Sequence, residues 1–259
     1  MTGLAPSPVG TLHPFAQLRP LLAEIGDAKR VRVAGAPGSL AEQAFARTWA
    51  RLVAGEDVAD VAYSETAAAV ARARLAGIDA GVLTTAGLSD AEALDVLRRG
   101  FDEVAGPLDA ELRARLRDAL RPLRSPAAAP ALAGTLNAQP RAGATAPGRP
   151  RIVVEPPESH GDHCLTVAVY GVLVAPVVGA DPVAPFLLGV AHHLHNVVLP
   201  DAGFAGEVLL GSALDRVLQV HHHARAAAFT ASQALDDLEL VHAGPVQAYH
   251  LDVLAAAGL

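Results

Sequence analysis

Apolar residues recur every three or four positions through the first 120 residues, which is the spacing of amphipathic α-helices. Ser39 and Ser89 each stand three positions before a glutamate, a capping-box pattern in which the two side chains satisfy backbone amides at a helix start. Gly26 and Gly55 follow apolar segments and can end helices. The pattern predicts helices at residues 15–25, 39–55, 58–75, 89–104 and 109–120.

Residues 122–150 interrupt this pattern. They are rich in proline, alanine and glycine and lack a sustained apolar period, so we predict a flexible linker. The linker would separate an N-terminal helical bundle, residues 1–121, from a C-terminal helical domain, residues 151–259.

The apolar periods return after the linker in more hydrophobic runs. Residues 164–175 predict one helix, and residues 183–198 predict another that Asp181 can cap. Further helices are expected at residues 207–235 and 247–257. Together the two halves predict an all-α protein.

Composition narrows the class of protein. The 259-residue chain is 51% hydrophobic but only 4% aromatic, which favours helices packed through small side chains. Its formal net charge of −7 argues against a nucleic-acid partner, because phosphate contacts need a basic surface.

The sequence also bears on location. Cys164 is the only cysteine, which excludes an intrachain disulfide, and the N-terminus lacks the pattern of a signal peptide. The most apolar run, residues 164–180, is shorter than the roughly 20 residues of a membrane span, and Pro176 interrupts it. We therefore expect a cytoplasmic protein without a stable membrane span.

Histidines are concentrated in the C-terminal half of the chain. His192, His193 and His195 fall within four positions near the end of the predicted helix 183–198. Residues three apart share a helix face, so His192 and His195 should point the same way, with His193 about 100° around the axis.

Two further residues can join this cluster. If the helices on either side of Gly179 pack antiparallel, His163 lies at the same end of the pair as His192. Glu207 adds a carboxylate at the next loop-to-helix junction. Imidazole and carboxylate ligands suit iron, manganese or zinc, so we predict a divalent-metal site. The candidate ligands are His163, His192, His193, His195 and Glu207.

Asp162 and Asp201 are the candidate catalytic acids, each able to act as a general base or to orient the ligands. The alternative for any single histidine is a surface or hydrogen-bonded core residue. His221–His223 can equally form a solvated helix end.

The histidine pattern resembles the HD-domain superfamily of metal-dependent phosphohydrolases, which has an oxygenase branch. His163 matches the superfamily's first histidine, and residues 186–196 match the apolar helix that ends in its His-Asp pair. The chain contains no His-Asp dipeptide, so His192-His193 or His195-Asn196 would replace it. The resemblance implies metal-dependent hydrolysis or, with iron, oxygen chemistry.

The pattern also resembles the zinc-binding family of ubiquinone-biosynthesis proteins, which are all-helical. His195, followed after eleven residues by Glu207 with Gly206 before it, reproduces the second half of their motif. Ala191 and His192 stand where that family has His and Asp. This resemblance implies a non-catalytic protein in which metal stabilises helices around an apolar ligand.

The leading prediction is a hydrolase that acts on a small molecule through metal-activated water. The alternatives are an iron-dependent oxygenase on the same scaffold and a metal-stabilised scaffold or apolar-ligand-binding protein. An apolar tunnel lined by residues 165–178 would favour the last of these. The sequence favours no oligomeric state.

Overall fold

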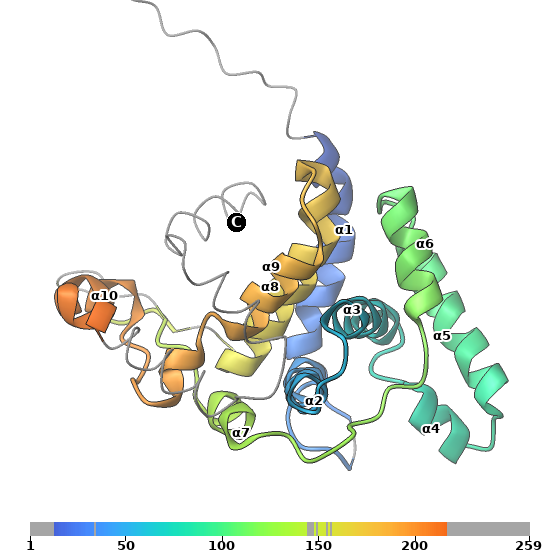
Figure 1. Cartoon of the computed structure of the whole chain (residues 1–259), viewed down its shortest axis with the longest axis horizontal. Coiled ribbons are helices and arrows are strands. Elements are labelled where there is room, and N and C mark those ends of the chain that lie inside the picture. Colours follow the sequence, from blue (N-terminus) through green and yellow to red (C-terminus); the bar gives the residue numbers. More distant parts are fainter. Residues whose placement is uncertain are drawn as a thin grey trace, which may run out of the picture.

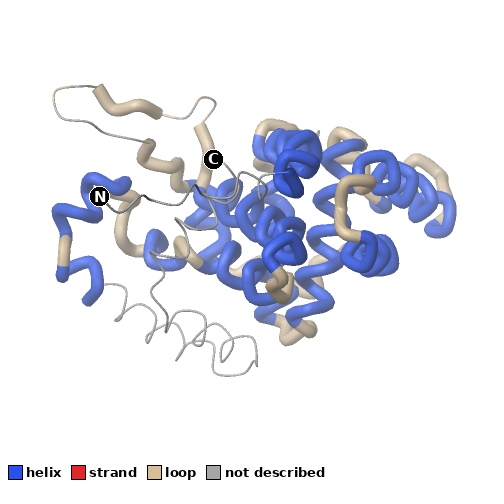
Figure 2. Tube along the Cα trace, turned by 90° about the horizontal axis from the view of Figure 1, so that it is seen from above, coloured by secondary structure: helices blue, strands red, loops and turns tan. Residues whose placement is uncertain are grey.

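The protein is helical in all of its described regular structure (Figure 1; Figure 2). The described residues contain no strand and only isolated bridge residues, among them the pair Pro140 and Ser159, which confirms the all-α prediction. His221–His223 and the predicted helix 247–257 lie outside the described residues. The computed structural model describes residues 13–33, 35–143, 148, 150–153, 155 and 157–216.

The helices predicted in the N-terminal half are all present. At the first capping box the Glu42 amide donates to Ser39 Oγ over 3.0 Å, and the Ser39 amide donates to Glu42 Oε2 over 2.8 Å. A short additional helix, α4 (Ala80–Thr85), is capped by Asp79, whose carboxylate accepts from the amide of Val82. The others are α1 (His13–Gly26), the 3₁₀ turn η2 (Asp27–Lys29), α2 (Leu40–Val53), α3 (Val58–Arg74), α5 (Asp90–Val104) and α6 (Ala110–Ala119).

The segment predicted to be a flexible linker contains a packed helix, α7 (Ala131–Ala138). Leu132, Ala133 and Leu136 of this helix are buried, so the apolar spacing in this short segment does form one face of a helix. A single cluster of buried hydrophobic residues extends from α1 through α7 to the C-terminal helices. The N-terminal helices and the histidine-bearing helices therefore share one core.

The C-terminal helices differ from the prediction at their ends. The helix predicted from residue 164 begins at His160, because Ser159 and Asp162 form a capping box. The helix predicted over 183–198 ends at Ala191, and its last residues form a separate 3₁₀ turn. The elements are α8 (His160–Val174), η3 (Ala175–Val178), α9 (Val183–Ala191), η4 (Leu194–Val197) and α10 (Gly203–Leu210).

Helices α8 and α9 approach unusually closely. A Cβ atom added to Gly189 would lie 2.3 Å from Cα of Ala168, and one added to Gly171 would lie 2.8 Å from Cβ of Pro185. From Ala168 to Gly171 along α8, the contacting residue on α9 changes from Gly189 back to Pro185, so the two helices are antiparallel. Glycine at these positions allows the backbones to pack at a distance that any larger residue would prevent.

Helix α8 is the most buried element of the C-terminal half, beside α9 and α1 and against α2 (Figure 1). Residues 160–178 are long and apolar enough, at a mean hydropathy of 1.5, to pass a length-and-composition test for membrane spans. However, 61% of their most apolar window is buried within the protein, so helix packing accounts for the hydropathy. The described residues give no clear membrane span.

Candidate metal centre

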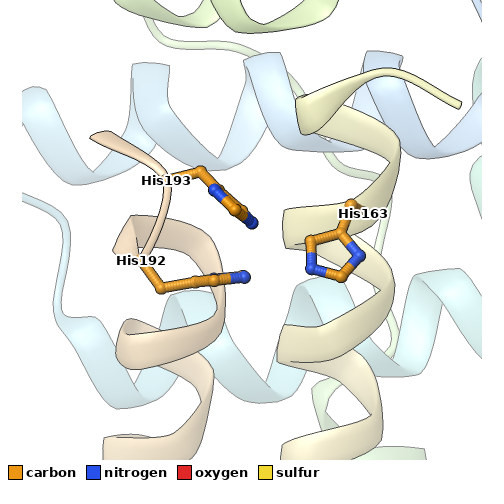
Figure 3. A group of neighbouring side chains, drawn as sticks. All are labelled: His163, His192 and His193. Carbon is orange, nitrogen blue, oxygen red and sulfur yellow. The ribbon is translucent and has the colours of Figure 1, made fainter. Parts of the chain in front are cut away.

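Three imidazoles converge between α8 and the end of α9 (Figure 3). One ring nitrogen each of His163, His192 and His193 lies within 4.8 Å of the corresponding atoms of the other two. The ring centroid of His163 is 5.1 Å from each of the other two, which are 4.3 Å from each other. In the described part of the chain, no other set of potential ligands converges this tightly. We call these residues the three-histidine centre.

The end of α9 explains how two consecutive histidines face the same partner. Successive residues of a helix point about 100° apart, so a continuous helix would have directed His192 and His193 differently. The helix instead ends at Ala191, and His193 leaves helical geometry with φ −104° and ψ 17°. The close contact at Gly189 then holds both imidazoles opposite His163 on α8.

A hydrogen bond defines the tautomer of His192. Its Nδ1 donates to the carbonyl oxygen of Gly189 over 2.7 Å, because a carbonyl can only accept. The neutral ring therefore carries its lone pair on Nε2, the nitrogen suited to a metal.

His193 has the same arrangement with a different partner. Its Nδ1 lies 2.7 Å from Oδ1 of Asn196, and the amide nitrogen of Asn196 donates to the carbonyl of Leu199 over 3.0 Å. The second bond fixes the orientation of the amide, so Oδ1 accepts from His193 and the lone pair is again on Nε2. Burial, followed by the neighbouring His192 and His163, lowers the pKa of His193 well below its usual value, which keeps it in the neutral form that binds metals.

His163 completes the pattern through a carboxylate. Its Nδ1 lies 3.6 Å from Oε1 of Glu158, and Lys29 lies 3.5 Å from the other oxygen. Burial acts to raise the pKa of Glu158, but His163, Lys29 and Arg141 together lower it to about 2, so this side chain is ionised. A carboxylate behind an imidazole is the usual support for a metal-binding histidine.

The donor set fits a divalent ion. Nδ1 of His192 and Nδ1 of His193 each donate to an acceptor, so the Nε2 atoms of these two rings carry the lone pairs, and Nδ1 of His163 lies 3.6 Å from the carboxylate of Glu158. Catalytic zinc sites have three protein ligands and leave a fourth position for water or substrate. Three imidazoles therefore fit zinc of the catalytic type.

The other two predicted ligands lie outside this group. The ring of His195, in η4, is 5.8 Å from that of His193, and Glu207 lies on α10. The predicted pairing of His192 with His195 on one helix face does not form, because α9 ends before either residue. Burial and the nearby Asp201 raise the pKa of Glu207.

The two predicted catalytic acids have different surroundings. Asp162 is 1% exposed; it accepts hydrogen bonds from the amide of Ser159 and from the hydroxyl of Ser39 on the loop before α2. One carboxylate oxygen of Asp162 therefore caps α8, and the other joins α8 to the start of α2.

Asp201 lies nearer to the imidazoles. Its carboxylate accepts from the amides of Ala142 and Gly203 over 2.9 and 2.8 Å, and its Oδ2 lies 3.7 Å from Nε2 of His160. Burial acts to raise the pKa of Asp201, but the two amides, His160 and Arg141 lower it. Asp201 is therefore an ionised group beside the centre.

Sequence reasoning did not identify the residues that orient the imidazoles. This role is performed by Glu158, Gly189 and Asn196. Only Asn196 could have been recognised in the sequence, because it lies three positions after His193. It also left out His160, which is fully buried with its ring 4.6 Å from that of His193. Burial lowers the pKa of His160 to about 4, so it is neutral at physiological pH.

No family model, curated protein or solved structure matches this chain.

Proposed function

We propose that this chain binds one zinc ion through Nε2 of His163, His192 and His193 and hydrolyses a small molecule. The observation that carries the proposal is the orientation of the rings: three imidazoles converge, two of them donate from Nδ1 to an acceptor, and Nδ1 of the third lies 3.6 Å from a carboxylate. A packing accident does not require polar partners behind the rings. A metal site does, because the ligand nitrogens must be held in place.

In this chemistry the protein would hold the three imidazole rings in position and support them with hydrogen-bond acceptors and carboxylates. A bound zinc ion would lower the pKa of its water to near 7 and polarise a substrate oxygen. Gly189 and Asn196 hold two of the rings, while Glu158 increases the basicity of the third. Asp201 is placed to orient groups beside the centre through His160, whereas Asp162 is fully used in helix capping.

The ligand set favours hydrolysis over oxygen chemistry. Non-haem iron oxygenases of the common type use two histidines and one carboxylate, and no carboxylate joins the three-histidine centre in the described residues. The scaffold alternative requires residues 165–178 to line an apolar tunnel. Leu165, Val169, Val172 and Leu173 are instead buried in the common core.

Elemental analysis of the purified, untagged protein tests the proposal. We expect about one equivalent of zinc per chain, lost in His192→Ala and retained in His195→Ala, the matched control from the same segment. The zinc-loaded protein should hydrolyse simple carboxylic or phosphoric esters, and His192→Ala should not. Equal zinc contents in both variants would contradict the proposed ligands, and zinc without hydrolysis would leave a structural site.

A further inference from the structure

A short backbone pairing places a positive charge beside the three-histidine centre. The Arg141 amide donates to the carbonyl of Glu158 over 2.7 Å, and the His160 amide donates to the carbonyl of Gln139 over 3.1 Å. The segment after α7 is thereby joined to the start of α8. Arg141 and His160, which are distant in sequence, come together at the edge of the centre.

His160 is an unusual residue in a helix core. It is 0% exposed, and neither of its ring nitrogens has a hydrogen-bond partner. Burying an unpaired polar group costs free energy, and such groups are uncommon in native proteins. Its ring packs against that of His193, with the two ring centroids 4.6 Å apart.

A second unpaired group approaches the same point. Nε of Arg141 is buried without a hydrogen-bond partner and lies 3.6 Å from Oδ2 of Asp201. Nε2 of His160 lies 3.7 Å from the same oxygen. Both distances are longer than the length of a hydrogen bond. Asp201 accepts from two backbone amides and forms a longer ion pair with Arg141, so its carboxylate lies near both groups without a hydrogen bond to either of these two nitrogens.

We propose that Arg141 and His160 form an oxyanion subsite beside the three-histidine centre, and that its ligand carries a carboxylate or phosphate group. The inference rests on the proposed function and adds the class of substrate. Arginine binds both groups through paired N–H donors, and a neutral imidazole can add a third.

The proposed subsite combines a partly exposed group with a buried one. The side chain of Arg141 is 30% exposed, whereas His160 is fully buried. A ligand can therefore enter past the guanidinium group and place its negative end against the imidazole. The rest of the ligand would then lie toward the three-histidine centre.

Cobalt-loaded full-length protein provides the test, because the visible spectrum of Co²⁺ reports on its surroundings. Inorganic phosphate and acetate are titrated separately into the wild type, Arg141→Gln and Arg113→Gln. Arg113 is exposed on α6, so the control carries the same charge change away from the site. Calorimetry with both anions is repeated on the metal-free protein, and cobalt content is measured for every sample.

We expect at least one anion to bind, and Arg141→Gln to weaken its binding by about tenfold or more while cobalt content stays unchanged. The anion that binds more tightly distinguishes phosphate from carboxylate chemistry. Cobalt binding without an anion effect, or an equal effect in both arginine variants, overturns the subsite and leaves the metal centre standing. Absence of cobalt binding overturns the proposed function, and calorimetry then still decides whether Arg141 binds anions.

Discussion

Two groups of polar side chains in the described part of the protein are built on opposite principles. Between α2 and α3, Arg51 donates to Glu65 over 3.0 Å and to Ser64 over 2.9 Å, and Arg47 donates to both oxygens of Glu65. We call Arg47, Arg51 and Glu65 the ion cluster. Each charge there has an opposite charge at hydrogen-bonding distance, so the cluster is complete within the chain.

The three-histidine centre brings together groups of the same kind instead. One ring nitrogen of each imidazole lies within 4.8 Å of those of the other two, and no carboxylate belongs to this group. The opposite charges of the ion cluster stabilise the fold by pairing with one another. The like groups of the three-histidine centre need a ligand, such as a metal ion, to pair with. Removing a partner should therefore affect folding in the first region and ligand binding in the second.

The largest effect is expected from Glu65→Ala. Glu65 is 0% exposed, and its loss leaves the buried guanidinium of Arg51 with fewer charged partners. Breaking a buried ion pair by removing one partner costs about 3–5 kcal/mol, so the midpoint of urea unfolding should fall sharply. Glu103→Ala, which removes the exposed partner of Arg74, should lower the stability far less, because water screens an exposed ion pair. Similar losses of unfolding free energy in the two variants would show that the ion cluster contributes no more to folding than an exposed ion pair does.

Zinc should provide the next largest effect. A ligand that binds only the folded state stabilises it by about 2.7 kcal/mol at 100 times its dissociation constant. Free zinc at that level should raise the unfolding free energy of the wild type, and a chelator should reverse the gain. His163→Ala should show no gain, whereas His195→Ala should resemble the wild type. A gain of equal size in His163→Ala would show that zinc binds elsewhere.

Gly189→Ala tests how the two helices create the centre. The added methyl would lie 2.3 Å from Cα of Ala168, a backbone atom that cannot move without shifting α8. Overpacking of this kind costs about 1–3 kcal/mol, and the separation of the helices should also weaken zinc binding. Gly134→Ala is the matched control, because an added Cβ meets no atom within 4 Å and alanine favours the helix. The two variants should shift the unfolding midpoint in opposite directions.

Local signals predicted much of this fold. The capping boxes at Ser39 and Ser89 and the apolar periods after them are properties of single segments, and those helices are present. The same pattern, Ser159 with Asp162, was available at the start of α8 and would have identified Asp162 as a capping residue. Its position next to His163 suggested catalysis instead.

The end of α9 could not be predicted in this way. No glycine or proline follows Ala191 until Pro200, so local propensity allows the helix to continue. In the structure the backbone leaves the helix instead and packs against α8 and α7. Along this segment His192 donates to Gly189, His193 donates to Asn196, and Asn196 donates to Leu199. Tertiary contacts of this kind decide which histidines converge, and so His193 joined the centre in place of His195.

The smallest expected effect is also the most specific to the centre. Asn196→Leu removes the acceptor for Nδ1 of His193 but leaves all three ligands in place. Loss of such a supporting bond typically lowers metal affinity by about 10- to 100-fold, which a competitive zinc titration would measure. Asn196→Asp keeps an acceptor and should retain most of the affinity. The unfolding free energy of each variant is also measured without zinc, which shows any effect on the fold separately. A loss of zinc affinity larger than the loss of metal-free stability identifies Asn196 as a support for the ligand His193. Equal affinities in the leucine and aspartate variants would mean that His193 is held by packing alone.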